Sequence, residues 1–86
     1  MKLKNKVSLI TGAGKGIGRS IAINFAREGS IVFINDINKE NADKTSNLIS
    51  EMGFNNFIYI ADVGNRNEVM EMFTFIFKNA GKIDIL

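Results

Sequence analysis

A glycine-rich stretch at residues 11–18, with the sequence TGAGKGIG, limits what this chain can fold into more than any other segment. An apolar run at residues 7–10 precedes it, and a segment with helical periodicity, residues 17–28, follows it. Glycine allows positive φ and lets the backbone approach a ligand closely. In a strand–turn–helix arrangement, the unpaired N–H groups of the first helical turn and the helix dipole both favour an anion. The stretch therefore predicts a cradle for a pyrophosphate.

The spacing of these glycines excludes two common phosphate-binding motifs. The fingerprint G-x-G-x-x-G fails because Ile17 and Arg19 stand where its third glycine would be. The motif G-x-x-x-x-G-K-[ST] fails because a glycine follows Lys15 where Ser or Thr is required. The pattern that fits is T-G-x-x-x-G-x-G. Glycines also occur in ordinary turns, so a purely structural turn is the alternative interpretation.

Strand-like and helix-like segments alternate along the whole chain, which is typical of repeated βαβ units. The expected strands are residues 7–11, 31–35, 56–61 and a fourth that opens at 83–86, and the expected helices are residues 17–28, 38–52 and 65–80. Nearly continuous apolar strands indicate a parallel sheet covered on both faces. We expect an α/β fold in which residues 1–86 form the N-terminal, dinucleotide-binding part of a Rossmann doubly wound parallel sheet, with strand order 3-2-1-4, truncated at strand four. Right-handed crossovers would place the first two helices on one face and the third on the other.

Apolar residues at helical spacing predict which face of each helix packs on the sheet. They are Ile17, Ile21, Ala22, Phe25 and Ala26 in the first helix, Ala42, Leu48, Ile49 and Met52 in the second, and Val69, Met70, Phe73, Ile76, Phe77 and Ala80 in the third. Asn65 or Asn67 is expected to begin the third helix. With Asn65 as the N-cap, Glu68 occupies the position of a capping-box partner. Gly81 is expected to end that helix.

Asp36 follows the second strand at close to the ~20-residue distance from the glycines that is expected of an acid binding a ribose. Its carboxylate can accept from both hydroxyls of a ribose diol, at ~1.5–3 kcal/mol per charge-assisted hydrogen bond. A 2′-phosphate would bring like charges together, at a cost of up to ~4 kcal/mol. Lys15 could pair with that phosphate and so favours NADP, although an exposed ion pair contributes only ~0–1 kcal/mol. The sequence therefore favours NAD over NADP as the cofactor, and an ordinary turn aspartate is the alternative.

Asp62 and Val63 follow the third strand directly. In the expected topology they lie at the same edge of the sheet as Asp36, where the carboxyl ends of the strands meet. The carboxylate could accept from the amino group of adenine, and the valine could pack on the ring. The alternative is that Asp62 only begins the turn before the third helix, and both roles are compatible.

Composition removes several classes of chemistry. The chain has no cysteine and no histidine, which excludes disulfides, thiol chemistry, histidine-based triads and zinc sites of the Cys/His kind. A net charge of +2 with scattered lysines gives no indication of nucleic-acid binding. The apolar run after the basic N-terminus is too short for a signal peptide, and no segment reaches the ~20 apolar residues of a membrane span. We expect no metal site, no nucleic-acid or membrane partner, and a soluble cytoplasmic protein.

Four motifs together resemble the N-terminal part of a classical short-chain dehydrogenase/reductase, and within that family the 3-oxoacyl-(acyl-carrier-protein) reductase-like group. They are Thr11-Gly12-x-x-x-Gly16-x-Gly18, Asp36, Asp62-Val63-Gly64-Asn65 and Gly81-Lys82-Ile83-Asp84-Ile85-Leu86. The resemblance implies a homo-oligomeric oxidoreductase that moves hydride between a nicotinamide cofactor and an alcohol or carbonyl, with 3-oxoacyl thioesters as a candidate substrate class. The cofactor-binding residues that it implies are Thr11, Gly12, Lys15, Gly16, Ile17, Gly18, Asp36, Asp62 and Val63.

The chain departs from that family because it lacks the family's catalytic motifs. In the family, strand four is followed by Asn-Asn-Ala-Gly, and later by a serine and a Tyr-x-x-x-Lys pair. Here the only tyrosine, Tyr59, has Val63 in the place of the lysine. We therefore expect no catalytic residue and no turnover from these 86 residues alone, and interpret them as part of a longer oxidoreductase. The alternative is a stand-alone dinucleotide-binding module or an inactive remnant.

Overall fold

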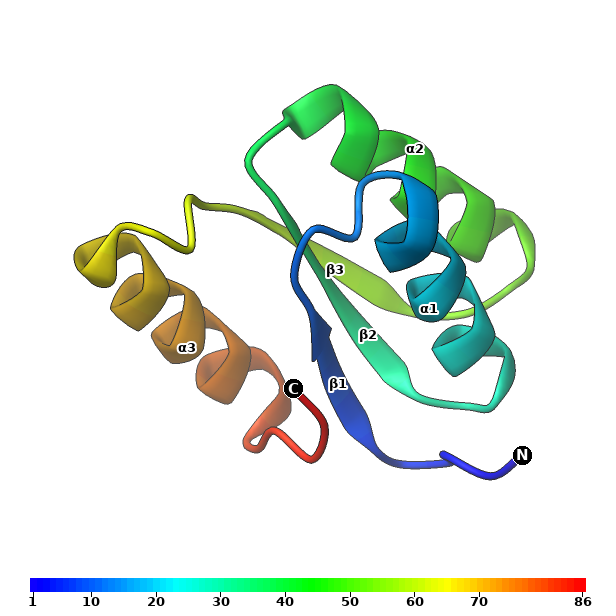
Figure 1. Cartoon of the computed structure of the whole chain (residues 1–86). Helices are drawn as coiled ribbons and strands as arrows, with labels where there is room; N and C mark the ends of the chain where they lie inside the picture. The colour runs from blue at the N-terminus through cyan, green and yellow to red at the C-terminus, as the bar shows by residue number, and fades with distance from the viewer.

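The structure, a computed structural model, describes residues 1–86 and contains three strands that alternate with three helices (Figure 1). The elements are β1 (Val7–Ile10), α1 (Gly16–Arg27), β2 (Ile31–Asp36), α2 (Lys39–Glu51), β3 (Asn56–Ile60) and α3 (Arg66–Ala80). The predicted βαβ alternation is therefore confirmed for these six elements, with ends that differ by at most one residue. No helix has the length and apolar character needed to cross a membrane.

The three strands form one parallel sheet with β2 in the middle. Leu9 of β1 lies opposite Phe33 of β2, and Phe33 lies opposite Phe57 of β3. On the outer side of β1, Ile85 forms an isolated parallel bridge with Ser8, so the C-terminal segment lies beside β1 without forming a named strand (Figure 1). The expected order of the first three strands is confirmed, and a complete fourth strand stays a prediction.

The helices cover both faces of the sheet, with α1 and α2 on one side and α3 on the other, as predicted (Figure 1). The core under α1 and α2 contains Ile10, Ala13, Ala22, Ala26, Val32, Ile34, Ala42 and Ile49. The core under α3 contains Val7, Leu9, Phe33, Ala61, Met72 and Ile76. Because successive residues of a strand point to opposite faces, β2 supplies apolar side chains to both cores. This explains why its sequence is almost uninterruptedly apolar.

Several predicted core positions on α1 and α2 are wrong. Ile17 is 81% exposed and Ile21 is 38% exposed, so the buried face of α1 consists mainly of its alanines. On α2, Leu48 is exposed, and the polar Thr45 is fully buried in the face that packs on the sheet. Thr45 can occupy this place because its hydroxyl has hydrogen-bond partners there.

The predicted buried face of α3 is confirmed only in part, since Ile76 is buried and Phe73 and Ala80 pack against the core. Met70 and Phe77 are exposed, whereas Met72 is buried and Phe75 packs in the aromatic part of the core. The helix carries large apolar residues on nearly every side, so the periodicity of its sequence could not select one face. Contact with Phe33 of β2 selects the face that is buried.

The start of α3 confirms one half of the predicted capping box and contradicts the other. The Asn65 side chain accepts from the Glu68 N–H at 3.1 Å, as an N-cap does. The Glu68 carboxylate accepts from the Asp62 N–H at 3.2 Å and not from that of Asn65. The Asn65 N–H donates instead to the Asp62 carbonyl at 2.9 Å, because the turn before α3 folds back on itself. Gly81, in the left-handed region, ends the helix as predicted.

Candidate functional site

The carboxyl ends of β1, β2 and β3 meet at one edge of the sheet and surround a small cavity of about 190 Å³. The residues that line it are Gly12, Asn35, Asp36, Ile37, Ala61, Asp62 and Val63. Four of them belong to the predicted cofactor-binding set, namely Gly12, Asp36, Asp62 and Val63. The fold therefore gathers residues from three separate loops at one place, as a ligand that spans those loops would require.

The glycines of the loop between β1 and α1 are required for different structural reasons. Gly12 has a φ of 62° and Gly16 a φ of 59°, values that L side chains rarely adopt. A Cβ on Gly18 would collide with the carbonyl oxygen of Gly12. The loop can therefore turn this tightly against the start of α1 only with glycine at position 18.

The N-terminus of α1 offers several unpaired donors. Lys15 occupies the N-cap position with an extended backbone, its side chain accepts no capping hydrogen bond, and the first turn contains no acidic residue. The N–H groups of Lys15, Gly16, Ile17 and Gly18 have no acceptor in the structure, and the first donor into the helix is the N–H of Arg19, at 3.3 Å from the Lys15 carbonyl. Unpaired N–H groups at the positive end of a helix dipole attract an anion.

Asp36, at the end of β2, is half-buried and fixed by two backbone donors. One carboxylate oxygen accepts from the Gly14 N–H at 2.9 Å, and the other accepts from the Asn38 N–H at 2.9 Å. A carboxylate offers about four acceptor sites, so each oxygen keeps a site for a ligand hydroxyl. A Cβ on Gly14 would lie only 2.6 Å from the nearer oxygen, which explains why the loop approaches the carboxylate through a glycine.

Asp62 and Val63 lie on the opposite side of the same cavity from the glycine loop. Asp62 accepts from the Gly64 N–H at 2.8 Å with one carboxylate oxygen, and its carbonyl accepts from the Asn65 N–H at 2.9 Å. The alternative interpretation of Asp62, a role in the turn before α3, is therefore confirmed, and its contact with adenine stays a prediction. Its second carboxylate oxygen has no partner, and Val63 is 55% exposed, so both keep the capacity to contact a ligand.

The remaining predicted site residues do not line this cavity. Lys15, Gly16 and Ile17 are exposed at the start of α1. Thr11 belongs to a separate hollow of about 350 Å³, lined mainly by apolar residues of β1, α1 and the C-terminal segment. The structure therefore does not bring Thr11 into the cavity that holds Asp36 and Asp62.

Three residues that the sequence did not single out shape this edge. The buried amide of Asn35 donates to the carbonyl oxygens of Tyr59 and Ala61, both at 3.1 Å, and so fixes the end of β3 against β2. Arg19 and Thr45 join the glycine loop to α2. A polar residue in an otherwise apolar strand or helix face was the available signal for Asn35 and Thr45, and nothing in the sequence distinguished Arg19 from an exposed cation.

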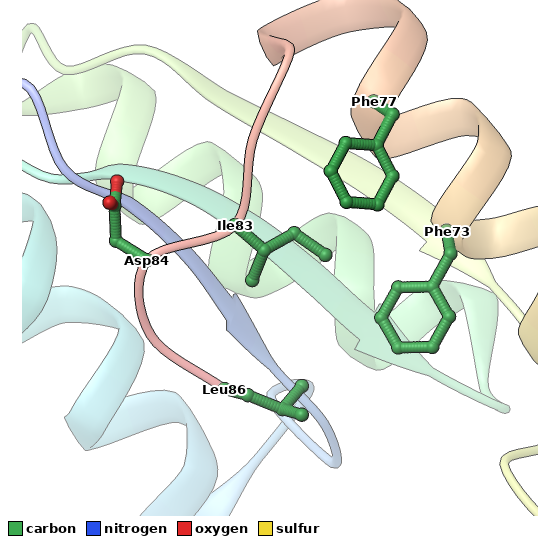
Figure 2. Close-up of a pocket in the computed structure, with 5 residues that line it drawn as sticks. All are labelled: Phe73, Phe77, Ile83, Asp84 and Leu86. Carbon is green, nitrogen blue, oxygen red and sulfur yellow. The ribbon is translucent and has the colours of Figure 1, made fainter.

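The largest cavity, of about 510 Å³, is elsewhere and has a different character (Figure 2). Figure 2 shows Phe73, Phe77 and Ile83 turned toward one another, with the carboxylate of Asp84 directed away from the two phenylalanines. That carboxylate accepts from the Val7 N–H at 2.8 Å and pairs with the Lys82 ammonium at 3.1 Å. The hydrogen bond from Val7, followed by that from Lys82, lowers the pKa of Asp84 from its ordinary value. No group with chemical function converges on this apolar cavity.

Comparison with known proteins agrees with this geometry. A family model described as short chain dehydrogenase matches residues 6–86. The chain belongs to the short-chain dehydrogenase/reductase family. The family resemblance stated from the glycine stretch and the three later motifs is thus confirmed.

Individual members of the short-chain dehydrogenase/reductase family align with the whole chain. The 7alpha-hydroxysteroid dehydrogenase of Escherichia coli is 37% identical over 86 residues, which are 100% of this chain and 34% of that protein. The short-chain dehydrogenase/reductase homolog YusS of Bacillus subtilis is 34% identical over 87 residues, covering 100% of this chain and 80% of that protein. A solved structure of 7alpha-hydroxysteroid dehydrogenase in complex with NADH and 7-oxo glycochenodeoxycholic acid superposes with a TM-score of 0.94 and 35% identity, covering 98% of this chain and 33% of that one. The chain thus spans about a third of the hydroxysteroid dehydrogenases that it matches.

Proposed function

We propose that the edge formed by the glycine loop, Asp36 and Asp62 binds a nicotinamide dinucleotide, and that this chain serves an oxidoreductase that moves hydride between that cofactor and an alcohol or carbonyl. The observation that carries the proposal is the set of unpaired N–H groups at the start of α1, next to a fixed carboxylate. A dinucleotide has a pyrophosphate for the former and a ribose diol for the latter. The NADH-bound hydroxysteroid dehydrogenase, which is 35% identical, supports it.

In this proposal each part of the edge has one task. The glycine loop and the N–H groups of residues 15–18 receive the pyrophosphate, with Lys15 and Ile17 at its exposed side and Thr11 supporting the loop from β1. Asp36 accepts from the adenosine ribose hydroxyls with its remaining lone pairs. Asp62 accepts from the adenine amino group with its unpartnered oxygen, and Val63 packs against the ring.

We propose NAD rather than NADP as the cofactor. A 2′-phosphate would lie beside the Asp36 carboxylate, and two like charges about 4 Å apart repel by up to ~4 kcal/mol at an effective dielectric constant near 20. Lys15 is exposed, and an exposed ion pair contributes only ~0–1 kcal/mol. The repulsion at Asp36 therefore outweighs the attraction at Lys15.

No residue of this chain is proposed to transfer a proton. Tyr59 is the only tyrosine, and its ring packs 5.1 Å from that of Phe75 in the core under α3. The substrate is proposed only as a class, a secondary alcohol or its ketone, with 3-oxoacyl thioesters and hydroxysteroids as two candidates. Dinucleotide binding without catalysis is the second candidate function. These 86 residues are expected to turn over no substrate under either function, so sequencing beyond Leu86, in search of a Tyr-x-x-x-Lys pair, separates the two.

Titration of NADH and NADPH into the chain, followed by the fluorescence of the reduced nicotinamide, tests the proposal. We expect NADH to bind and Gly16→Ala to weaken it, because an alanine is strained at a φ of 59°. The matched control is Gly53→Ala, in the turn after α2, where φ is 87° and a Cβ likewise meets no neighbour within 4 Å. It should lower thermal stability similarly and leave the NADH affinity unchanged. A folded chain that binds neither dinucleotide would contradict the proposal.

A further inference from the structure

The inner part of the glycine loop is fixed by hydrogen bonds to β2 and α2. Ala13 is fully buried, and its N–H donates to the Asn35 carbonyl of β2 at 2.9 Å. Its carbonyl accepts from the buried hydroxyl of Thr45, on α2, at 2.8 Å. Both backbone groups of Ala13 are therefore committed to the protein, and none remains for a ligand.

The next residue, Gly14, is also buried and bound on both sides. Its N–H donates to Asp36, and its carbonyl accepts from the Arg19 guanidinium. The same Arg19 nitrogen lies 3.4 Å from the Asn41 carbonyl of α2, and Arg19 Nε donates to the Thr45 hydroxyl at 2.9 Å. Arg19 thus links the loop, the first turn of α1 and the side of α2.

The charge of Arg19 has no direct counter-charge. The guanidinium is half-buried, and every acceptor that it contacts is a neutral carbonyl or hydroxyl oxygen. The only salt bridges are Lys39–Asp43 and Lys82–Asp84. A half-buried cation is screened less by salt than an exposed one, so it adds to the positive potential behind the unpaired N–H groups of α1.

We propose that Arg19 is the positioning residue of the dinucleotide site and that Thr45 is its partner. The inference rests on the proposed function and adds to it two residues that need not touch the cofactor. By holding the Gly14 carbonyl, Arg19 keeps the Gly14 N–H directed at Asp36. The pyrophosphate cradle and the ribose acceptor are thereby held in one relative orientation. Loss of this link lets the loop move away from the carboxylate, and both halves of the site are affected together.

The geometry explains why arginine is required. Its planar guanidinium directs Nε and Nη2 at different acceptors, whereas the single ammonium of a lysine cannot reproduce that fork. Position 19 is also a defined position of the common glycine fingerprint. In G-x-G-x-x-G counted from Gly14, Arg19 stands where the third glycine would be. Here Gly18 provides the close approach to the loop, which leaves position 19 available for the link to α2.

The test measures the NADH dissociation constant and the unfolding temperature of the full chain and its variants. We expect Arg19→Met to raise the NADH dissociation constant by about tenfold to a hundredfold, the range expected for loss of a hydrogen bond to a charged group. Arg27→Met is the matched control, because it removes a guanidinium from the exposed last turn of the same helix. Its dissociation constant should equal that of the unaltered chain.

Two changes at Thr45 test the partnership. Thr45→Val removes the hydroxyl at nearly constant shape and should raise the NADH dissociation constant severalfold, whereas Thr45→Ser keeps the hydroxyl and should restore it. If the residues act together, Arg19→Met and Thr45→Val combined should weaken binding by less than the product of their separate effects. Hydrogen exchange supplies a ligand-independent readout, in which Arg19→Met should speed exchange at the Gly14 amide and leave the amides of α3 unchanged.

Three outcomes would overturn the inference, and they separate it from the proposed function. If the unaltered chain binds no dinucleotide, both are wrong. If NADH binds and Arg19→Met lowers only the unfolding temperature, Arg19 is a purely structural link between α1 and α2. If Arg19→Met does not fold, Thr45→Val decides the matter, and an unchanged dissociation constant in that variant excludes the positioning role.

Discussion

The N-terminus of α1 is built differently from those of α2 and α3. Asn38 accepts from the third N–H of α2 at 2.9 Å, and Asn65 does the same for α3 at 3.1 Å. Each of these helices also has an acidic residue in its first turn, Glu40 or Glu68. Helix α1 begins at Lys15 with neither feature. A missing N-cap costs about 1 kcal/mol, so α1 tolerates a stability loss that the other two helices avoid.

This difference indicates which helix start has N–H groups available to bind an anionic ligand. In α2 and α3, an asparagine side chain occupies one donor of the first turn, and an acidic residue there partly offsets the positive end of the dipole. In α1 the donors are unoccupied, and the nearby cations Lys15 and Arg19 strengthen the positive potential instead of reducing it. An anionic ligand would supply at α1 what an asparagine supplies at the other helix starts. The changes below test this comparison, from the largest expected effect to the smallest.

Gly18→Ala should have the largest effect, because a Cβ there collides with the Gly12 carbonyl. Overpacking of this kind costs ~1–3 kcal/mol of unfolding free energy, and the displaced loop should lose measurable NADH binding. Glu71→Ala is the control, because Glu71 is an exposed residue of α3 that makes no side-chain hydrogen bond. It should cost less than about 1 kcal/mol and leave NADH binding intact. Denaturant unfolding and NADH titration measure both quantities, and equal binding by Gly18→Ala and the unaltered chain would contradict the comparison.

Asp36→Ala should rank second, because this carboxylate links the uncapped and capped helix starts through Gly14 and Asn38. Loss of charge-assisted hydrogen bonds, at ~1.5–3 kcal/mol each, should raise the NADH dissociation constant about tenfold to a hundredfold. NADPH should bind more tightly than before, since the repulsion from the carboxylate is removed. Asp43→Ala, on the exposed side of α2, is the control for net charge and should change neither value. A preference of the unaltered chain for NADPH would refute the assignment of Asp36.

Asn65→Ala should separate helix stability from ligand binding. It removes the cap of α3 and should lower the unfolding free energy by about 1 kcal/mol. The NADH dissociation constant should stay the same at temperatures where the variant is folded, because the Asn65 side chain is not among the proposed ligand contacts and no anionic group is expected at the donors of α3. Thermal unfolding and NADH titration on one sample check both parts. If binding falls as much as in the glycine-loop variants, the starts of α1 and α3 are not functionally distinct.

Lys15→Ser should give α1 a side-chain N-cap like those of the other two helices. Lys15 already has the extended backbone of an N-cap residue, at φ −158° and ψ 171°, so a serine can accept from the first turn without rearrangement. We expect a gain of a few tenths to about 1 kcal/mol in unfolding free energy and weaker NADH binding, because the new cap competes with the pyrophosphate for a donor. Lys44→Ser, at an exposed position of α2, controls for the lost charge. Tighter NADH binding by the Lys15 variant would contradict this view of α1.

The sequence predicted the first three strands, the three helices and the glycine loop because each rests on local chemistry. An apolar run between two covering layers, a glycine at positive φ and an asparagine at a helix start are local features of the sequence. Side-chain hydrogen bonds between segments that lie far apart in the sequence could not be predicted from local features. Arg19 meets Thr45 across 26 positions of sequence, and only the packing of α1 beside α2 brings them together. The buried face of α3 was predicted only in part for the converse reason, since the local pattern of its apolar residues fits several faces.

The smallest effect is expected at the amino end of β1. There, in contrast to the start of α1, a backbone N–H group is paired with a carboxylate. Asp84 accepts from the Val7 N–H, and this bond, aided by Lys82 and the more distant Lys6, lowers the pKa of the Asp84 carboxyl. A lowered pKa in the folded state means that the carboxylate stabilises the fold above the ordinary aspartate pKa, near 4, and that this contribution is lost as pH falls through the folded value.

Asp84→Asn should therefore lower the unfolding temperature slightly at neutral pH and should flatten its decline as the pH falls below about 4. The protection factor of the Val7 amide, which compares its exchange rate with that of an unstructured peptide at the same pH, should fall on acidification in the unaltered chain, because protonated Asp84 is a weaker acceptor. NADH binding at pH 7 should not change, since Asp84 lies at the amino end of β1 and the unpaired donors of α1 lie beyond its carboxyl end. Thermal unfolding across pH, with Asp43→Asn as the control for an exposed aspartate, measures the effect. If the unfolding temperatures of Asp84→Asn and the unaltered chain depend on pH in the same way, pairing the Val7 N–H with a carboxylate does not stabilise the fold. The comparison between this paired donor and the unpaired donors of α1 would then fail.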